Sequence, residues 1–160
     1  MPGLTHIGIA FMIQLIAPDI PIWALLLATE FLDIICIILS ILGVEKMPTK
    51  EKAPIAPYSH GLFMALIWTL IASLITWFIS NDAYTTFVIG GLVFSHWILD
   101  FIASPMTYVY PNDTGKPIFF QNSRKIGLGL WRSKTAVIIG EYLVTLLGLI
   151  LYIIWLIIRI

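Results

Sequence analysis

The sequence predicts an all-α integral membrane protein, built as a bundle of five transmembrane helices or as four such helices plus one re-entrant helix. Hydrophobic residues make up 59% of the 160 residues and charged residues only 11%, which is unusual for a soluble globular domain. Apolar runs near the roughly 20 residues that a bilayer core requires fill nearly the whole chain. We therefore expect a single transmembrane domain over residues 1–160.

The apolar runs also place the individual helices. Backbone groups in hydrocarbon must bond internally, so each run is expected to be helical. The proline-containing turn at residues 18–21 ends the first run, which is short enough to re-enter rather than cross. A loop rich in proline, glycine and aromatic residues is predicted over 105–132. The predicted spans cover residues 4–17, 20–43, 58–80, 84–104 and 133–158.

The basic residues predict the orientation. With five spans, eight of the nine fall on one side and only Arg159 on the other. The eight are Lys46, Lys50, Lys52, Lys116, Arg124, Lys125, Arg132 and Lys134. Positive residues favour the cytoplasmic side, so we expect an inner-membrane protein with its N-terminus in the cytoplasm and its C-terminus outside. The net charge of zero gives no reason to expect nucleic acid as a partner, whereas membrane lipid is an expected one.

Ionisable residues inside the predicted spans are the main functional observation. They cost several kcal/mol each in a membrane and by default mark a functional site. At a rise of about 1.5 Å per residue, all of them fall in the predicted cytoplasmic half or near the midplane. They are His6, Glu30, Asp33, His60, His96, Asp100 and Glu141.

The spacing of these residues adds chemistry. His96 and Asp100 are four residues apart and Glu30 and Asp33 are three apart, so each pair shares a helix face. Imidazole nitrogens with carboxylate oxygens suit Zn²⁺, Mn²⁺ or Fe²⁺. The residues also allow other interpretations. The histidines and aspartates could form interhelical hydrogen bonds without a metal, and Glu141 could pair with a basic residue such as Lys134 or Arg132, or with a helix neighbour.

Several short motifs resemble a known family. Thr5–His6, Tyr58–Ser59–His60–Gly61 and the segment GLVFSHWILD at 91–100, followed by Ser104–Pro105, are similar to motifs of the membrane-bound metal-dependent hydrolases that include a LexA-binding inner-membrane protein of bacteria. The chain departs from the family at its PDxD-type motif, where Glu30 and Asp33 stand. The resemblance implies a divalent-metal site in a helical membrane domain.

The leading functional hypothesis is a metal-dependent hydrolase that acts on a lipid or other amphiphilic ester or phosphoester at the cytoplasmic leaflet. Its predicted metal ligands are Asp33, His60, His96 and Asp100, with His6 completing the set. Glu30 is the candidate general base or a ligand of a second metal ion. The alternatives are a metal-ion or proton transporter and a non-catalytic membrane scaffold. Self-association into a homo-oligomer is left open.

Overall fold

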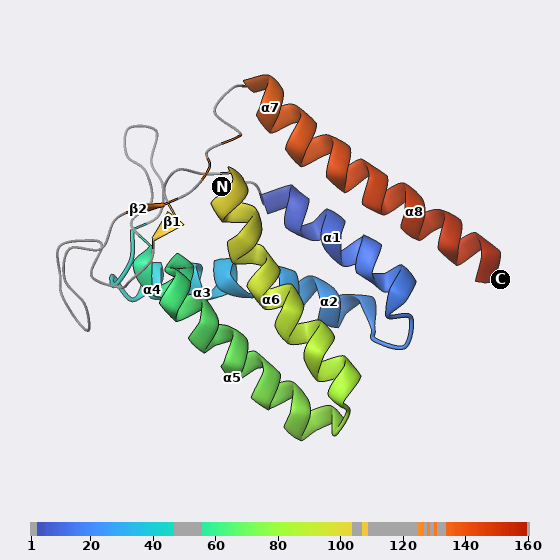
Figure 1. The fold of residues 1–160 in the computed structure, drawn as a ribbon, viewed down its shortest axis with the longest axis horizontal. Coiled ribbons are helices and arrows are strands. Elements are labelled where there is room, and N and C mark those ends of the chain that lie inside the picture. Colours follow the sequence, from blue (N-terminus) through green and yellow to red (C-terminus); the bar gives the residue numbers. More distant parts are fainter. Residues whose placement is uncertain are drawn as a thin grey trace.

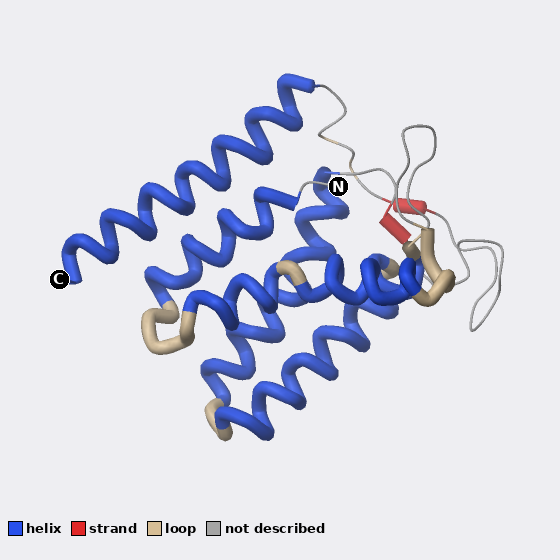
Figure 2. Tube along the Cα trace, turned by 180° about the vertical axis from the view of Figure 1, so that it is seen from behind, coloured by secondary structure: helices blue, strands red, loops and turns tan. Residues whose placement is uncertain are grey.

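A computed structural model describes residues 3–46, 56–103, 107–108, 125–126, 128, 130 and 134–159. Successive helical arms alternate in direction, and two very short strands lie at one end of the molecule (Figures 1 and 2). The helices are α1 (Gly3–Ile16), α2 (Ile22–Thr29), α3 (Phe31–Ile41), α4 (Pro57–His60), α5 (Leu62–Ser80), α6 (Ala83–Ala103), α7 (Lys134–Ile138) and α8 (Val144–Arg159), with a π-helical segment (Ile139–Leu143) joining the last two.

Within the described residues, three helices are long and apolar enough to cross a membrane: Leu62–Ser80, Ala83–Ala103 and Thr135–Arg159. The pair α2 and α3 makes a fourth if the two are one bent span. Helix α1 is apolar but has 14 residues, about 21 Å at a rise of about 1.5 Å per residue, which is less than the roughly 30 Å of a hydrocarbon core. The structure therefore supports three to four spans, and a fifth stays a prediction.

The predicted span 20–43 is not one straight helix. It breaks at Glu30, and the axes of α2 and α3 differ by 56°. Neither proline nor glycine occurs at the break, so the local sequence carries no helix breaker. A tertiary contact acts there instead, because the carbonyl oxygen of Thr29 lies 2.6 Å from Nδ1 of His96 on α6. In an uninterrupted helix that carbonyl would accept the amide N–H four residues later.

Two further spans differ in detail from the prediction. Residues 58–80 divide at Gly61, whose backbone is extended, into the single turn α4 and the long helix α5. His60 therefore ends a turn that precedes the span. The last helix contains the π-helical segment Ile139–Leu143, whose wider turn places Glu141 toward α1.

The helices pack at close range where side chains are small. Helix α1 lies along α8, and α5 lies along α6 (Figure 1). A Cβ atom on Gly148 would meet the backbone carbonyl oxygen of Gly8, and one on Gly8 would lie 2.8 Å from Cα of Thr145. Leu25, Leu32 and other apolar side chains fill the interior.

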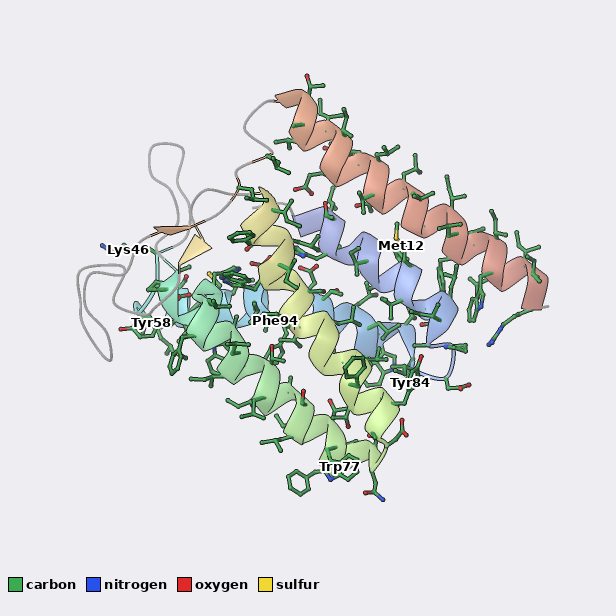
Figure 3. All side chains as sticks on the ribbon, in the orientation of Figure 1. Met12, Lys46, Tyr58, Trp77, Tyr84 and Phe94 are labelled. Atoms are coloured by element: carbon green, nitrogen blue, oxygen red, sulfur yellow. The ribbon has the colours of Figure 1, made fainter. Side chains whose placement is uncertain are left out.

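The outer surface is strongly apolar. Side chains such as Trp77 project from the outer face of α5 (Figure 3), and Phe78 and Ile158 are each about four-fifths exposed. Exposed apolar faces of this extent suit a lipid environment rather than water, which agrees with a membrane protein.

The segment predicted as the loop 105–132 contains a short antiparallel pairing. Strand β1 (Thr107–Tyr108) pairs with β2 (Lys125–Ile126). The backbone N–H of Leu128 donates to the carbonyl of Phe101, which fastens this region to the end of α6. Most of the basic residues behind the predicted orientation lie outside the described residues, so the orientation stays a prediction.

Candidate metal centre

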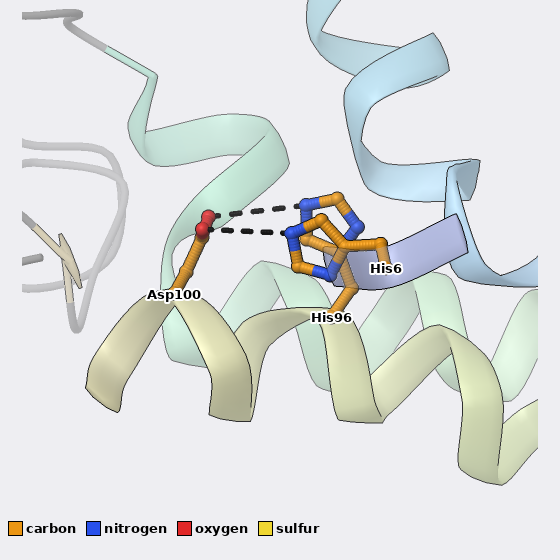
Figure 4. Close-up of side chains that lie close together, drawn as sticks. All are labelled: His6, His96 and Asp100. Atoms are coloured by element: carbon orange, nitrogen blue, oxygen red, sulfur yellow. Dashed lines mark ion pairs between the residues drawn. The ribbon is translucent and has the colours of Figure 1, made fainter. Parts of the chain in front are cut away.

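Five side chains that are far apart in the sequence meet at one place between the helices. The chain has three histidines, and all of them lie here. His6 comes from α1, Asp33 from α3, His60 from the end of α4, and His96 and Asp100 from successive turns of α6. Figure 4 shows His6 and His96 beside Asp100, with the two imidazole rings overlapping.

Four of the side chains bring imidazole nitrogens close to carboxylate oxygens. His60 Nε2 lies 3.1 Å from Asp33 Oδ1 and 3.5 Å from Asp100 Oδ2. His96 Nε2 lies 3.8 Å from each of the same two oxygens. Around a tetrahedral ion with ligand bonds of about 2.0–2.2 Å, neighbouring ligand atoms are separated by about 3.3–3.6 Å. These four nitrogen–oxygen distances are close to that spacing, and we call Asp33, His60, His96 and Asp100 the ligand quartet.

His6 joins the quartet from a second side. Its Nε2 lies 3.8 Å from Asp100 Oδ1, the oxygen that faces away from His60. Its ring stacks on that of His96, with the centroids 3.7 Å apart and the planes inclined by 3°. Within the described residues, His6, His96 and Asp100 form one group that could hold a metal ion, and Asp33, His60 and His96 form another.

Burial makes these groups expensive without a cation. Asp33 is the open side of the centre, since its side chain is 25% exposed while that of Asp100 is only 6% exposed. Among the described residues, His96 Nε2, Asp100 Oδ1 and His6 Nδ1 have no hydrogen-bond partner although they are buried. Buried polar atoms are normally paired, and leaving them unpaired is costly. The unpaired His96 Nε2 and Asp100 Oδ1 thus fit a divalent ion, which they could ligate.

The break in the second span fixes the orientation of His96. A carbonyl oxygen can only accept a hydrogen bond, so Nδ1 of His96 must be the donor to Thr29. In the neutral ring, Nε2 then carries the lone pair and points toward the aspartates. Histidines that bind metals commonly have this arrangement, with the second nitrogen donating to a carbonyl or carboxylate.

Glu30 lies beside the quartet rather than in it. It lines a cavity of about 450 Å³ whose other lining residues are Gly3, Leu4, Ile7, Val137, Glu141 and Tyr142. Its Oε1 atom is buried and has no hydrogen-bond partner among the described residues. Glu30 is close enough to His6, Asp33 and Asp100 to interact with them electrostatically. The cavity therefore brings a carboxylate and space for small molecules next to the quartet.

Glu141 has a structural partner on the neighbouring helix α1. Its Oε2 accepts the backbone N–H of Leu4 at 3.0 Å, so it satisfies one of the free donors at the start of α1. The predicted pairing with Lys134 or Arg132 concerns side chains that lie outside the described residues. Thr29, Ser59 and Glu45 are further polar residues near the site to which sequence reasoning assigned no role there.

Comparison of the chain with protein-family models, with curated proteins and with solved structures found no match.

Proposed function

We propose that the protein is a metal-dependent hydrolase that acts on a lipid or another amphiphilic ester or phosphoester at the cytoplasmic leaflet. The observation that carries the proposal is the ligand quartet, in which each of two imidazole nitrogens lies 3.1–3.8 Å from each of two carboxylate oxygens. Zn²⁺, Mn²⁺ and Fe²⁺ are the ions that suit such a nitrogen and oxygen donor set.

The residues around the quartet support hydrolysis in particular. A divalent ion held there would polarise a carbonyl or phosphoryl oxygen and lower the pKa of a water molecule. Glu30 faces the adjoining cavity, where its carboxylate would accept the proton of the attacking water. Asp33 leaves the quartet accessible on one side.

The surroundings favour an amphiphilic substrate. The outer faces of α5 and α8 are apolar, so the acyl part of a lipid would remain in the bilayer. The cavity lies at the start of α1, beside Gly3 and Leu4, and would receive the polar part. A fully soluble substrate would make no contact with these apolar faces.

The test is elemental analysis of the detergent-purified protein by mass spectrometry, with His96→Ala beside the wild type. We expect about one equivalent of a transition metal in the wild type and loss of most of it in the variant. Ser95→Ala is the matched control. Among the described contacts, the hydroxyl of Ser95 bonds only within α6, to the carbonyl of Leu92. It should keep its metal.

Hydrolysis is then measured with vesicles of zwitterionic and anionic phospholipid. Release of a water-soluble head group or a free fatty acid by the wild type, and not by His96→Ala, would support the proposal. A wild type that stays metal-free after incubation with Zn²⁺, Mn²⁺ and Fe²⁺ would overturn it.

One observation favours a second candidate, transport of a metal ion. Secondary transporters often bind ions where a membrane helix is discontinuous, and α2 and α3 meet at such a discontinuity beside Asp33. Uptake of Mn²⁺ or Zn²⁺ into proteoliposomes by the wild type, and its loss in Asp33→Asn, would identify transport. Tight binding with no uptake would leave hydrolysis as the better account.

A further inference from the structure

Two buried polar residues stand directly behind His60, on the side away from the ligand quartet. Glu45 follows the end of α3 and is 3% exposed, and Ser59 lies in α4 and is fully buried. Neither belongs to the groups that could hold a metal ion. A serine that is fully buried is also inaccessible to substrate, so it is no candidate nucleophile.

Glu45 is held by three hydrogen bonds from one short stretch of chain. Its Oε1 accepts the backbone N–H of Tyr58 at 2.7 Å and that of Ser59 at 2.8 Å. Its Oε2 accepts the hydroxyl of Ser59 at 2.7 Å. Both carboxylate oxygens therefore act as acceptors, and the orientation of the carboxylate is fixed.

The single hydroxyl proton of Ser59 determines what its other neighbour does. Ser59 Oγ lies 2.7 Å from Nδ1 of His60. Since the hydroxyl donates its only proton to Glu45, Oγ can only accept from the ring, and Nδ1 of His60 must be the donor. Nε2 of His60 then faces Asp100 and lies 3.1 Å from Asp33 Oδ1, within hydrogen-bond distance. Without an ion it donates to this carboxylate, and a bound ion would take the place of that proton.

We propose that Glu45 and Ser59 are positioning residues that keep a proton on Nδ1 of His60, so that Nε2 is the nitrogen that binds the ion. The predicted effect on metal affinity rests on the proposed function. The predicted position of the proton does not depend on that function. The arrangement also matches that of His96, whose Nδ1 donates to Thr29. The two histidines of the quartet are thus oriented in the same way by different partners.

Glu45→Gln tests the proposal with a change of nearly equal volume. The amide oxygen must face the two backbone N–H groups, which leaves the amide nitrogen as a donor toward Ser59. The hydroxyl of Ser59 then turns and donates to His60, so Nδ1 of the ring no longer carries a proton and the remaining proton is on Nε2. We expect zinc affinity to fall about 10–100-fold, the usual effect of losing an outer-shell partner.

The position of the proton is read directly by ¹⁵N NMR of the metal-free, full-length protein labelled on histidine. The chain has three histidines, so three rings give the whole spectrum, and single variants assign them. In the wild type, Nδ1 of His60 should carry a proton, and in Glu45→Gln it should not. An unchanged His60 signal in Glu45→Gln, or a wild-type Nδ1 without a proton, would overturn the inference.

Two variants guard against a general loss of structure. Ser59→Ala removes the acceptor without adding volume, and it should lower zinc affinity by a similar factor. Gln14→Leu is the control, because Gln14 is equally buried but bonds the carbonyls of Ala17 and Ile20 at the far end of α1. It should leave both the His60 signal and zinc affinity unchanged.

The results separate the two proposals. A proton on Nδ1 that depends on Glu45, in a protein that binds no metal, would confirm the positioning role and overturn the hydrolase. Metal binding that is the same in Glu45→Gln, Ser59→Ala and the wild type would leave the metal site standing and overturn the positioning role.

Discussion

The imidazole rings of His6 and His96 lie face to face, with their centroids 3.7 Å apart and their planes inclined by only 3°. Two positively charged rings at this distance would repel each other strongly in a buried site. The stack therefore requires that at least one ring be neutral, which is the form in which histidine binds metals. Because His6 also faces Asp100 Oδ1, it supports two members of the ligand quartet at once.

Replacing His6 by phenylalanine separates this support from metal ligation. The ring of His6→Phe preserves the stack on His96 but has no nitrogen to face Asp100. We expect the variant to keep about one equivalent of metal, with affinity lower by about tenfold because the partner of Asp100 is gone. Metal titration of His6→Phe and His60→Phe in parallel checks this. Equal loss of metal in both variants would show that His6 is as necessary for metal binding as His60.

Replacing Glu30 by glutamine tests its role as general base. Glu30→Gln keeps the size of the side chain and its place at the cavity but cannot take a proton from water. We expect turnover to fall about 10²–10⁴-fold, with the metal content unchanged. The measurement pairs initial rates on vesicles with elemental analysis of the same sample. Loss of metal together with activity would instead make Glu30 a ligand.

Replacing glycine by alanine should have opposite effects at Gly148, where α8 contacts α1, and at Gly91 on α6. In Gly148→Ala the new methyl group meets the backbone of Gly8, which cannot move aside as a side chain would. We expect the free energy of unfolding to fall by about 1–3 kcal/mol. Gly91 has nothing within 4 Å of the position of a Cβ atom, so Gly91→Ala should stabilise α6 by about 0.5–1 kcal/mol.

Unfolding of both glycine variants in mixed micelles, followed by circular dichroism, measures the two changes. Metal affinity should also drop in Gly148→Ala, because α1 carries His6. If Gly148→Ala is as stable as Gly91→Ala, the two backbones are not in contact.

Asp82, in the turn between α5 and α6, should make a pH-dependent contribution to the stability of the protein. The hydroxyl and the backbone N–H of Thr85 donate to this carboxylate, the latter at 2.7 Å, and they hold the pKa of Asp82 below its ordinary value of 3.8. A carboxyl whose pKa is lowered on folding stabilises the protein above that ordinary value, and the contribution is lost as the pH falls through the lowered pKa. Neutral pH therefore shows the full effect.

Thermal unfolding checks the cap at Asp82. At pH 7, Asp82→Ala should unfold a few degrees below the wild type, because the first turn of α6 loses its cap. Asp82→Asn retains an acceptor and should lie between them. The difference between Asp82→Ala and the wild type should shrink near pH 2, and a constant difference would show that the charge has no part in it.

The fold could be predicted where hydropathy alone determines a helix. The predicted spans 58–80, 84–104 and 133–158 overlap closely with the long apolar helices Leu62–Ser80, Ala83–Ala103 and Thr135–Arg159. The break at Glu30 could not be predicted, because residues 29–31 contain neither proline nor glycine. It depends on a contact between Thr29 and His96, 67 residues apart, which no local pattern encodes.

The site was predictable to the extent that charge in an apolar segment is conspicuous. His96 and Asp100 share a face of α6 by their spacing alone. Glu45 was not recognisable, because it stands in a polar loop segment with several other charged residues. Only its contact with Ser59, 14 residues away, distinguishes it from a solvated glutamate.

The contact between Gly8 and Gly148 has a consequence for the order in which the protein is assembled. All five candidate ligands lie between residues 6 and 100, so a ribosome delivers the complete set before the last helix leaves its tunnel. Until that helix inserts, α1 lacks the partner that packs along its length. The helix that carries His6, the first candidate ligand to be synthesised, thus completes its packing only after the rest of the set has been made.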